Sequence, residues 1–245
     1  MIVIHGFKGF MGWGFFPWLN EFFAEEGLAS CRFDLSRNGI GSNPDSFERL
    51  DLFRDDTYSI QIADVLAVAR HIETISEFAN LPRFLLGHSR GGGVAILSAA
   101  EIRGLAGIVT WSSISHTARW DEETKRKWRD DGKLDVLNAR TGQIMSLSTA
   151  VLDDVEQNAS RLDIGRAASE LDAPMLVIHG SSDETVPVEE AKTIVSRSRI
   201  GSLMVIESAT HTMNAIHPLV TIPPPLQLAA RASSRLMSTL AETGG

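Results

Sequence analysis

The chain has 245 residues, of which 43% are hydrophobic, and this size and composition suit one α/β domain with a large buried core. Its formal net charge is −8 at pH 7, so we do not expect the protein to bind nucleic acid through a basic surface. The single cysteine, Cys31, excludes an internal disulfide and a cysteine-based metal site.

The first residues, "MIVIHGF", are apolar, but this run is short and has neither a basic flank nor a small-residue cleavage site. We therefore predict no signal peptide. No other stretch approaches the length that is needed to span a bilayer. On these grounds we expect a cytoplasmic protein with no membrane partner.

Six short runs of aliphatic and β-branched residues predict strands. In chain order they are residues 2–5, 29–34, 84–87, 106–111, 175–179 and 203–207. Most are apolar almost throughout, which is typical of parallel strands covered on both faces. The longer amphipathic segments between them predict helices near residues 14–26, 57–78, 91–102, 188–199 and 226–240. This alternation predicts an α/β fold with a mostly parallel sheet and helices on both faces.

Residues 115–171 interrupt the alternation, because they contain no strand of the buried type. Their pattern predicts a helix at 121–132, a hairpin at 134–148 and a second helix at 150–162. So long an insertion is more often a lid or a binding element than a plain connection. We therefore predict a core made of residues 1–114 and 172–245 with an inserted lid, and the alternative is a surface excursion without a role.

The stretch "FLLGHSRGGGVAIL" places Ser89 between Gly87 and Gly91, where a predicted strand runs straight into a predicted helix. Such a turn forces the serine into a strained backbone conformation, and it requires small residues on either side. It also aims the hydroxyl outward, in front of a helix N-terminus that favours developing negative charge. Ser89 is therefore the predicted nucleophile.

A serine hydroxyl needs a base, and the base needs an orienting group. His211 follows the last predicted strand and is the predicted base, with His217 as the alternative. Asp183 follows the preceding strand and is the predicted orienting acid, with Glu184 as the alternative. Either acid could instead cap the helix that follows. The histidines on or beside strands are expected to be packed or hydrogen-bonded: His5, His88 and His179.

The chain order Ser89, Asp183, His211 is that of an α/β-hydrolase. The stretches "GHSRGG", "IHGSSDETVP" and "THTM" resemble the α/β-hydrolase superfamily over almost the whole chain, and "IHGFKGF" resembles its oxyanion loop. The details are most similar to bacterial serine acyl hydrolases related to cinnamoyl and feruloyl esterases, and more distantly to dienelactone hydrolase-related enzymes. The family usually has two further strands before "IVIHG".

The resemblance implies a role for each matching residue. Ser89 would attack the acyl carbon, His211 would transfer the proton, and Asp183 would hold the imidazole tautomer. The backbone N–H groups of Phe7 and Arg90 would form the oxyanion hole. The Arg90 side chain departs from the more usual Met or Gln, and it would point into the cleft or pair with an acid. Dienelactone hydrolases proper use a cysteine nucleophile, so their substrate is not carried over.

Together these features predict a serine esterase that acts on a small-molecule ester through an acyl-enzyme intermediate, with no cofactor and no metal. The alternatives are a serine peptidase or amidase, which would use the same triad, and a non-enzymatic ligand sensor on the same fold. Aromatic and basic residues of the predicted lid would suit a planar or anionic acyl group. The lid residues expected to contact substrate are His116, Trp120, Trp128 and Arg140.

The predicted strand at 29–34 would lie at the edge of the sheet, where its backbone groups are unpaired. Two outcomes are physically reasonable. A second copy of the chain would cover the edge in a homodimer, or the natural protein would begin upstream of Met1. We expect the second outcome.

Overall fold

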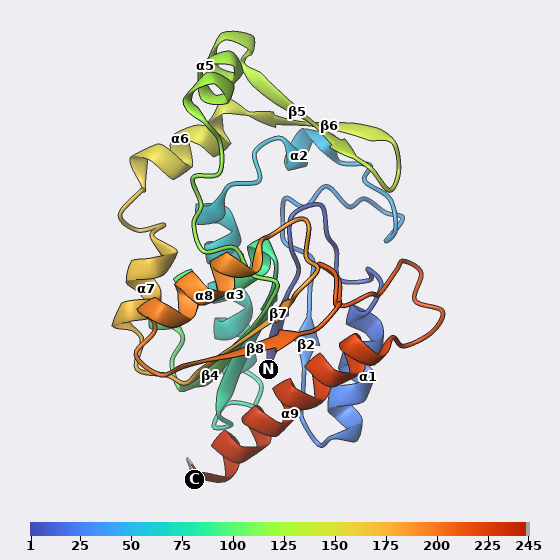
Figure 1. Ribbon diagram of the computed structural model, residues 1–245, viewed down its shortest axis with the longest axis vertical. Coiled ribbons are helices and arrows are strands. Elements are labelled where there is room, and N and C mark those ends of the chain that lie inside the picture. Colours follow the sequence, from blue (N-terminus) through green and yellow to red (C-terminus); the bar gives the residue numbers. More distant parts are fainter. Residues whose placement is uncertain (244–245) are drawn as a thin grey trace.

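A central sheet of six strands organises the protein, and the computed structural model describes residues 1–243 (Figure 1). The strands are β1 (Ile2–Ile4), β2 (Cys31–Arg32), β3 (Arg83–His88), β4 (Leu105–Trp111), β7 (Met175–Gly180) and β8 (Gly201–Ile206). Their order is β2-β1-β3-β4-β7-β8, and every neighbouring pair is parallel. The predicted fold class is confirmed.

Strand β2 forms one edge of the sheet and is shorter than the predicted strand at 29–34. It ends early because the residues after Arg32 bind the loop that follows β1. Asp34 Oδ1 accepts a hydrogen bond from the backbone N–H of Met11 at 2.8 Å. The backbone N–H of Leu35 donates to the ring of His5 at 3.2 Å. The backbone after β2 therefore supports a loop rather than extending the ladder.

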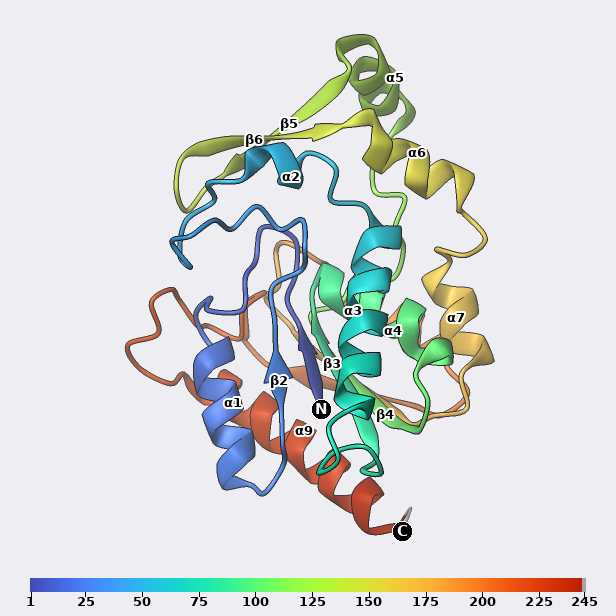
Figure 2. The same cartoon turned by 180° about the vertical axis from the view of Figure 1, so that it is seen from behind.

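Helices cover both faces of the sheet, as predicted (Figures 1 and 2). One face carries α3 (Tyr58–Glu73), α4 (Arg90–Ser98), α7 (Ile164–Glu170) and α8 (Val188–Arg197), and the other carries α1 (Phe16–Glu25) and α9 (Pro224–Thr243). Successive strand residues face opposite layers, so Ile2 and Ile4 pack with the first group of helices and Val3 packs with the second. Within residues 1–243 no helix combines the length and apolar character needed to cross a membrane.

Two helices of the first layer are shorter than predicted. Helix α3 ends at Glu73, and α4 gives way to the 3₁₀ turn η1 (Ala99–Glu101). The last helix instead begins earlier, at Pro224, because proline is well tolerated in the first turn of a helix.

The segment between β4 and β7 lies largely beyond the end of the sheet. It forms α5 (Glu122–Asp131), the antiparallel hairpin of β5 (Lys133–Asn138) and β6 (Gln143–Ser148), α6 (Thr149–Gln157) and α7. All but α7 gather at one end of the molecule, beside the short helix α2 (Leu50–Phe53) (Figures 1 and 2). The predicted helix at 150–162 ends at Gln157, and α7 follows as a separate helix that packs in the core layer through Ile164 and Ala168.

The outer elements have a hydrophobic cluster of their own. Its buried members are Phe10, Phe47, Phe53, Trp128, Met145, Leu147, Val151 and Leu152. Phe10 lies in the loop after β1, Phe47 in the loop before α2 and Phe53 in α2 itself, and the others come from α5, β6 and α6. Trp128 is 1% exposed, and its indole N–H donates to the carbonyl oxygen of Leu147 at 3.1 Å. The hairpin and its helices are therefore held on the sheet end by apolar packing.

Candidate active site

Ser89 lies at a sharp turn between β3 and α4, with φ 57° and ψ −123°. A non-glycine residue at such a φ is strained, and glycines on both sides make the turn possible. A Cβ added to Gly91 would lie 2.4 Å from the carbonyl oxygen of His5, and one added to Gly87 would lie 2.2 Å from the carbonyl oxygen of Gly91. Helix α4 thus starts in direct backbone contact with the end of β1, and Ser89 is presented at the carboxyl end of the sheet.

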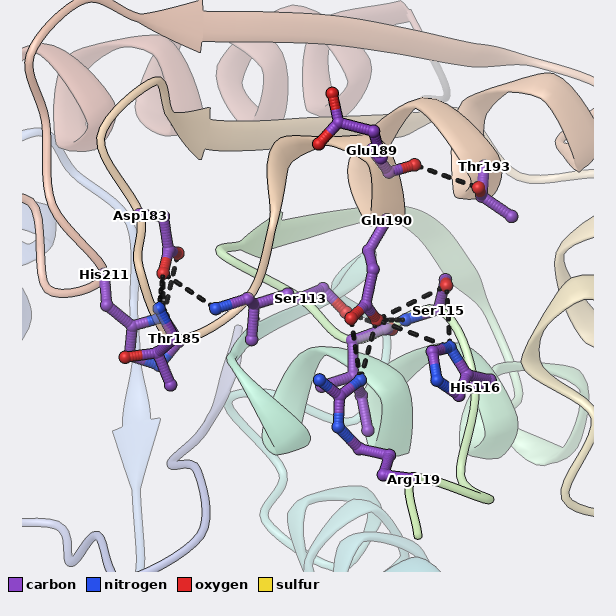
Figure 3. Close-up of polar contacts among 12 residues, drawn as sticks. Ser113, Ser115, His116, Arg119, Asp183, Thr185, Glu189, Glu190, Thr193 and His211 are labelled. Atoms are coloured by element: carbon purple, nitrogen blue, oxygen red, sulfur yellow. Dashed lines mark hydrogen bonds and ion pairs between the residues drawn. The ribbon is translucent and has the colours of Figure 1, made fainter. Parts of the chain in front are cut away.

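Asp183 and His211 are brought together by the loops after β7 and β8 (Figure 3). His211 Nδ1 lies 2.8 Å from Asp183 Oδ2 and 3.0 Å from Oδ1. Oδ1 also accepts the backbone N–H groups of Thr185 and Val186, each at 2.9 Å. Because the carboxylate only accepts, it holds the proton of His211 on Nδ1 and leaves Nε2 as a free base.

The environment of Asp183 keeps the carboxyl group ionised. Its side chain has no exposed surface, and the ring of His179 lies 3.3 Å from Oδ2. Burial acts to raise the pKa of Asp183, but the hydrogen bonds to His179 and His211 outweigh it and hold this pKa well below its usual range. An ionised carboxylate at this position accepts the Nδ1–H of His211 and so fixes the orientation of the imidazole ring.

Ser89 and His211 open onto the same cavity, which has a volume of about 220 Å³. Its walls are residues 6–9, Trp13, Phe16, His88, residues 138–140 of the β5–β6 hairpin, and Thr212. A small substrate in this cavity can reach both the serine hydroxyl and the imidazole. The insertion supplies part of the wall, at the turn of its hairpin.

The loop after β1 is held in place beside Ser89. A Cβ added to Gly6 would lie 2.9 Å from the Ser89 Cβ, so the loop backbone passes directly by the serine. His5 is buried, its Nδ1–H donates to the carbonyl oxygen of Gly6 at 2.9 Å, and burial lowers the pKa of its ring. The backbone N–H of Phe7 has no acceptor within residues 1–243. That of Arg90 lies at the first position of α4, where a helix offers no acceptor.

The Arg90 side chain neither enters the cavity nor forms an ion pair among the described residues. It is 6% exposed, and its guanidinium carbon lies 4.0 Å from the Tyr58 ring centroid and 5.2 Å from that of Phe7. Its Nη2 donates to the carbonyl oxygen of Asp56 at 2.9 Å. Burial raises the pKa of the Asp56 carboxyl to about 6, and the nearby Arg90 charge limits this rise. The Arg90 side chain therefore stabilises the turn at Ser89 through its contacts with Tyr58, Phe7 and the backbone of Asp56.

The two alternatives from the sequence do not take part in this arrangement. The Nδ1 atom of His217 accepts the backbone N–H of Gly14 at 2.9 Å, and its ring stacks on Trp13 with a centroid distance of 6.2 Å. The side chain of Glu184 is exposed and has no hydrogen bond to His211. Neither residue lines the cavity beside Ser89.

Of the four lid residues expected to contact substrate, the structure places only Arg140 at the cavity. Trp128 is buried in the cluster of the outer elements, and Trp120 packs edge-on against it with ring centroids 4.9 Å apart. His116 lies outside the cavity lining, 3.6 Å from the carboxylate of Glu190. The prediction for the two tryptophans was wrong because large apolar rings are more stable packed inside the insertion than exposed to solvent.

Glu190 joins the start of the insertion to helix α8. Figure 3 shows Ser115, His116 and Arg119 gathered around its carboxylate. Arg119 Nη1 lies 2.8 Å from both carboxylate oxygens, and the backbone N–H of Ser115 donates to Oε2 at 2.7 Å. The same helix begins just after the loop of Asp183, so one side chain ties the insertion to the loop that orients His211.

Sequence reasoning missed Lys8 and Asn138, which line the cavity. Lys8 Nζ donates to the carbonyl oxygen of Leu137 at 2.9 Å and so joins the loop after β1 to the hairpin. The position of Lys8 directly after Phe7, in the loop expected to bind the oxyanion, was a usable signal. Asn138 carried no comparable signal, because its approach to the cavity depends on how the hairpin packs.

Comparison with known proteins agrees with this architecture. The sequence profile of the alpha/beta hydrolase family matches residues 1–222. Human monoglyceride lipase (Homo sapiens) is 26% identical in an alignment of 197 residues, with 67% of this chain and 62% of the lipase covered. The aligned part thus spans less than two thirds of the length of that relative.

Solved structures share the fold over nearly the whole chain. Est1E from Butyrivibrio proteoclasticus with ferulic acid bound has a TM-score of 0.74 at 24% identity, covering 98% of this chain and 88% of Est1E. The monoacylglycerol lipase of Paleococcus ferrophilus has a TM-score of 0.70 at 17% identity, covering 98% of this chain and 93% of the lipase. At these identities the likeness concerns the fold.

Proposed function

Because the chain belongs to the alpha/beta hydrolase family, we propose that it hydrolyses carboxylic esters through Ser89, His211 and Asp183. The observation that carries the proposal is the Asp183–His211 pair, whose histidine lines the same cavity as a serine at a strained turn. The proposed reaction needs no metal and no cofactor.

In the first half of the proposed reaction, Ser89 Oγ attacks the acyl carbon while His211 Nε2 takes its proton. The ester carbonyl oxygen becomes negatively charged, and the N–H groups of Phe7 and Arg90 donate to it. Such a donor typically lowers the barrier by about 3 kcal/mol. The tetrahedral intermediate collapses when His211 returns the proton to the leaving alkoxide, and the acyl group stays on Ser89.

In the second half, a water molecule gives a proton to His211 and attacks the acyl-enzyme carbonyl carbon. The ester bond to Ser89 then breaks, the serine oxygen regains its proton from His211, and the acid is released. Asp183 stabilises the imidazolium in both halves. The proposed chemistry on an ester thus uses only water and the side-chain and backbone groups named above.

We propose a small ester as the substrate, because the cavity of about 220 Å³ limits the bound group. The named relatives, a monoglyceride lipase and Est1E with ferulic acid bound, support an ester with an acyl chain or an aromatic acid. We further propose that residues 115–171 act as a lid that sets substrate choice, since residues 138–140 line the cavity.

The test combines turnover of p-nitrophenyl butyrate with labelling by a neutral fluorophosphonate, each measured on wild type and Ser89→Ala. We expect wild type to turn over the ester and to carry one label on the peptide that contains Ser89. Ser89→Ala should lose the label and at least about 10⁴-fold in kcat, by analogy with other serine triads. Ser196→Ala, an exposed serine on α8, is the matched control and should behave as wild type.

Two results would contradict the proposal. Turnover that survives in Ser89→Ala would assign the chemistry to another group. Wild-type protein that neither takes the label nor hydrolyses any ester, while still binding small ligands, would favour a sensor. Faster cleavage of matched anilides than of esters would instead indicate an amidase.

A further inference from the structure

Two cationic side chains, Lys8 and Arg140, line the cavity that contains Ser89. Lys8 is half-buried in the loop after β1 and has a φ of 55°, a strained conformation for a side chain of this size. Arg140 lies on the turn of the β5–β6 hairpin, with its guanidinium carbon 5.3 Å from the ring centroid of Phe10. The two cations thus approach the cavity from the core and from the insertion.

Neither cation has an acidic partner. Within residues 1–243 no carboxylate oxygen lies within 4.0 Å of Lys8 or Arg140, and the cavity lining contains no Asp or Glu. The charge of Asp45 raises the pKa of Arg140, but the Asp45 side chain is 62% exposed and its Oδ1 lies 3.9 Å from the ring of His217. The chain carries a net charge of −8, yet Lys8 and Arg140 line the cavity of Ser89 without a carboxylate beside them.

Each of the two cations lies in an environment that disfavours its charged form. Burial and the charge of Arg140 both lower the pKa of Lys8, while burial lowers the pKa of Arg140 more than the charge of Asp45 raises it. An anion between the two groups would remove this penalty, and it would be held by charge-assisted hydrogen bonds in a partly desolvated site.

We propose that Lys8 and Arg140 bind a carboxylate on the substrate, so that the enzyme prefers esters that carry a negative charge over neutral esters of the same size. A carboxylate matches the planar fork of an arginine, and the lysine supplies a second, point-like cation. The inference rests on the proposed ester hydrolysis at Ser89, and it names the class of substrate for that site.

The test compares kcat/KM within two pairs of esters at pH 7.5. One pair places the charge on the acyl side: mono-p-nitrophenyl adipate against p-nitrophenyl hexanoate. The other places it on the leaving group: 4-acetoxybenzoate against 4-acetoxybenzamide. After correction for hydroxide-catalysed hydrolysis, we expect the anionic member of at least one pair to be preferred by about tenfold or more. Raising the salt concentration to 0.5 M should reduce the preference.

Variants assign the preference to the two side chains. Lys8→Gln and Arg140→Gln should each lower kcat/KM for the anionic ester about tenfold more than for its neutral counterpart. Arg140→Lys should keep part of the preference, because it keeps the charge. Arg126→Gln is the control, since it removes an exposed charge of α5 that lies outside the cavity lining. The ratio within a pair cancels any general loss of folded or active protein.

A binding measurement separates this inference from the proposed catalysis. Ser89→Ala protein should bind 4-acetoxybenzoate more tightly than 4-acetoxybenzamide in a calorimetric titration. If wild type hydrolyses esters without favouring either anionic probe, or if the variants affect both members of a pair equally, the inference is wrong and the esterase proposal stands. If anion binding is seen but no ester is cleaved, the esterase proposal fails and the anion site stands.

Discussion

His88 Nε2 donates a hydrogen bond to the backbone carbonyl oxygen of His211 at a distance of 2.9 Å. His88 is the last residue of β3 and directly precedes Ser89. This bond therefore connects the end of β3 to the loop after β8 that carries His211. The two rings lie 4.9 Å apart. The proposed base is thus located relative to the proposed nucleophile by a buried histidine outside the triad.

Burial of the His88 ring predicts a pH dependence of stability. Burial, with the nearby His211, lowers the pKa of His88 from 6.5 to about 3. The folded protein therefore binds fewer protons than the unfolded chain between these values, and its stability falls as the pH falls through that range. From pH 7.5 to pH 5 this group alone should remove about 2 kcal/mol from the free energy of unfolding.

His88→Gln tests that dependence, because glutamine keeps an N–H donor and does not titrate. Urea unfolding at pH 7.5 and pH 5 should show a smaller loss of stability in the variant than in wild type, by about 2 kcal/mol. The other titrating groups are common to both proteins and cancel in the comparison. Equal losses in the two proteins would mean that His88 is not held neutral by the fold.

Asp183→Asn should lower kcat for p-nitrophenyl butyrate by about 10⁴-fold with little change in KM. The amide can donate to Nδ1 of His211, which places the imidazole proton on Nε2 and removes the base. Glu184→Gln changes the neighbouring exposed acid and should retain wild-type kcat. The assignment of the orienting acid is refuted by the reverse pattern, with the larger loss in Glu184→Gln.

Gly91→Ala should prevent the turn at Ser89 from forming. The added Cβ would lie 2.4 Å from the carbonyl oxygen of His5 and 2.5 Å from that of Ile4, and neither backbone can move without disturbing β1. We expect a loss of about 3 kcal/mol in unfolding free energy by denaturant titration. Gly12→Ala is the control, because its nearest neighbours would be ring atoms of Phe10 at 3.5 Å. Comparable stability of the two variants would rule out this steric account.

Glu190→Gln should loosen the connection between the insertion and α8. The carboxylate side chain is 11% exposed and the Arg119 side chain is 28% exposed, so the variant leaves a partly buried arginine without its counter-ion. We expect a loss of about 1–3 kcal/mol in stability and faster proteolysis in the segment after β4. Glu189→Gln, on the same helix but 70% exposed and paired with Lys192, should change both readouts little.

Much of the site was readable from the sequence because its requirements are local. The turn at Ser89 needs glycine at position 87, because a Cβ there would lie 2.2 Å from the carbonyl oxygen of Gly91, and "GHSRGG" shows this glycine directly. The positions of Asp183 and His211 followed from strand order, since the carboxyl ends of parallel strands share one edge of the sheet. The structure places these two side chains in contact, as that reasoning requires.

The insertion was not readable in the same way, because its sequence predicts elements but not the direction in which they pack. Trp128 and Arg140 were equally good expectations for a substrate contact, yet one is buried inside the insertion and the other reaches the cavity. The role of the Arg90 side chain depended likewise on Tyr58, which is distant in sequence and close in space.

The sequence by itself therefore determined the α/β sheet and the order of its chemical groups, since apolar periodicity and glycine sterics act over a few residues. Only the tertiary structure decided which side chains close the cavity. Lys8 and Arg140 are 132 positions apart in number, and they line one cavity because the β5–β6 hairpin packs over the loop after β1. Packing between distant segments depends on the shape and burial of the whole core, which local sequence patterns do not specify.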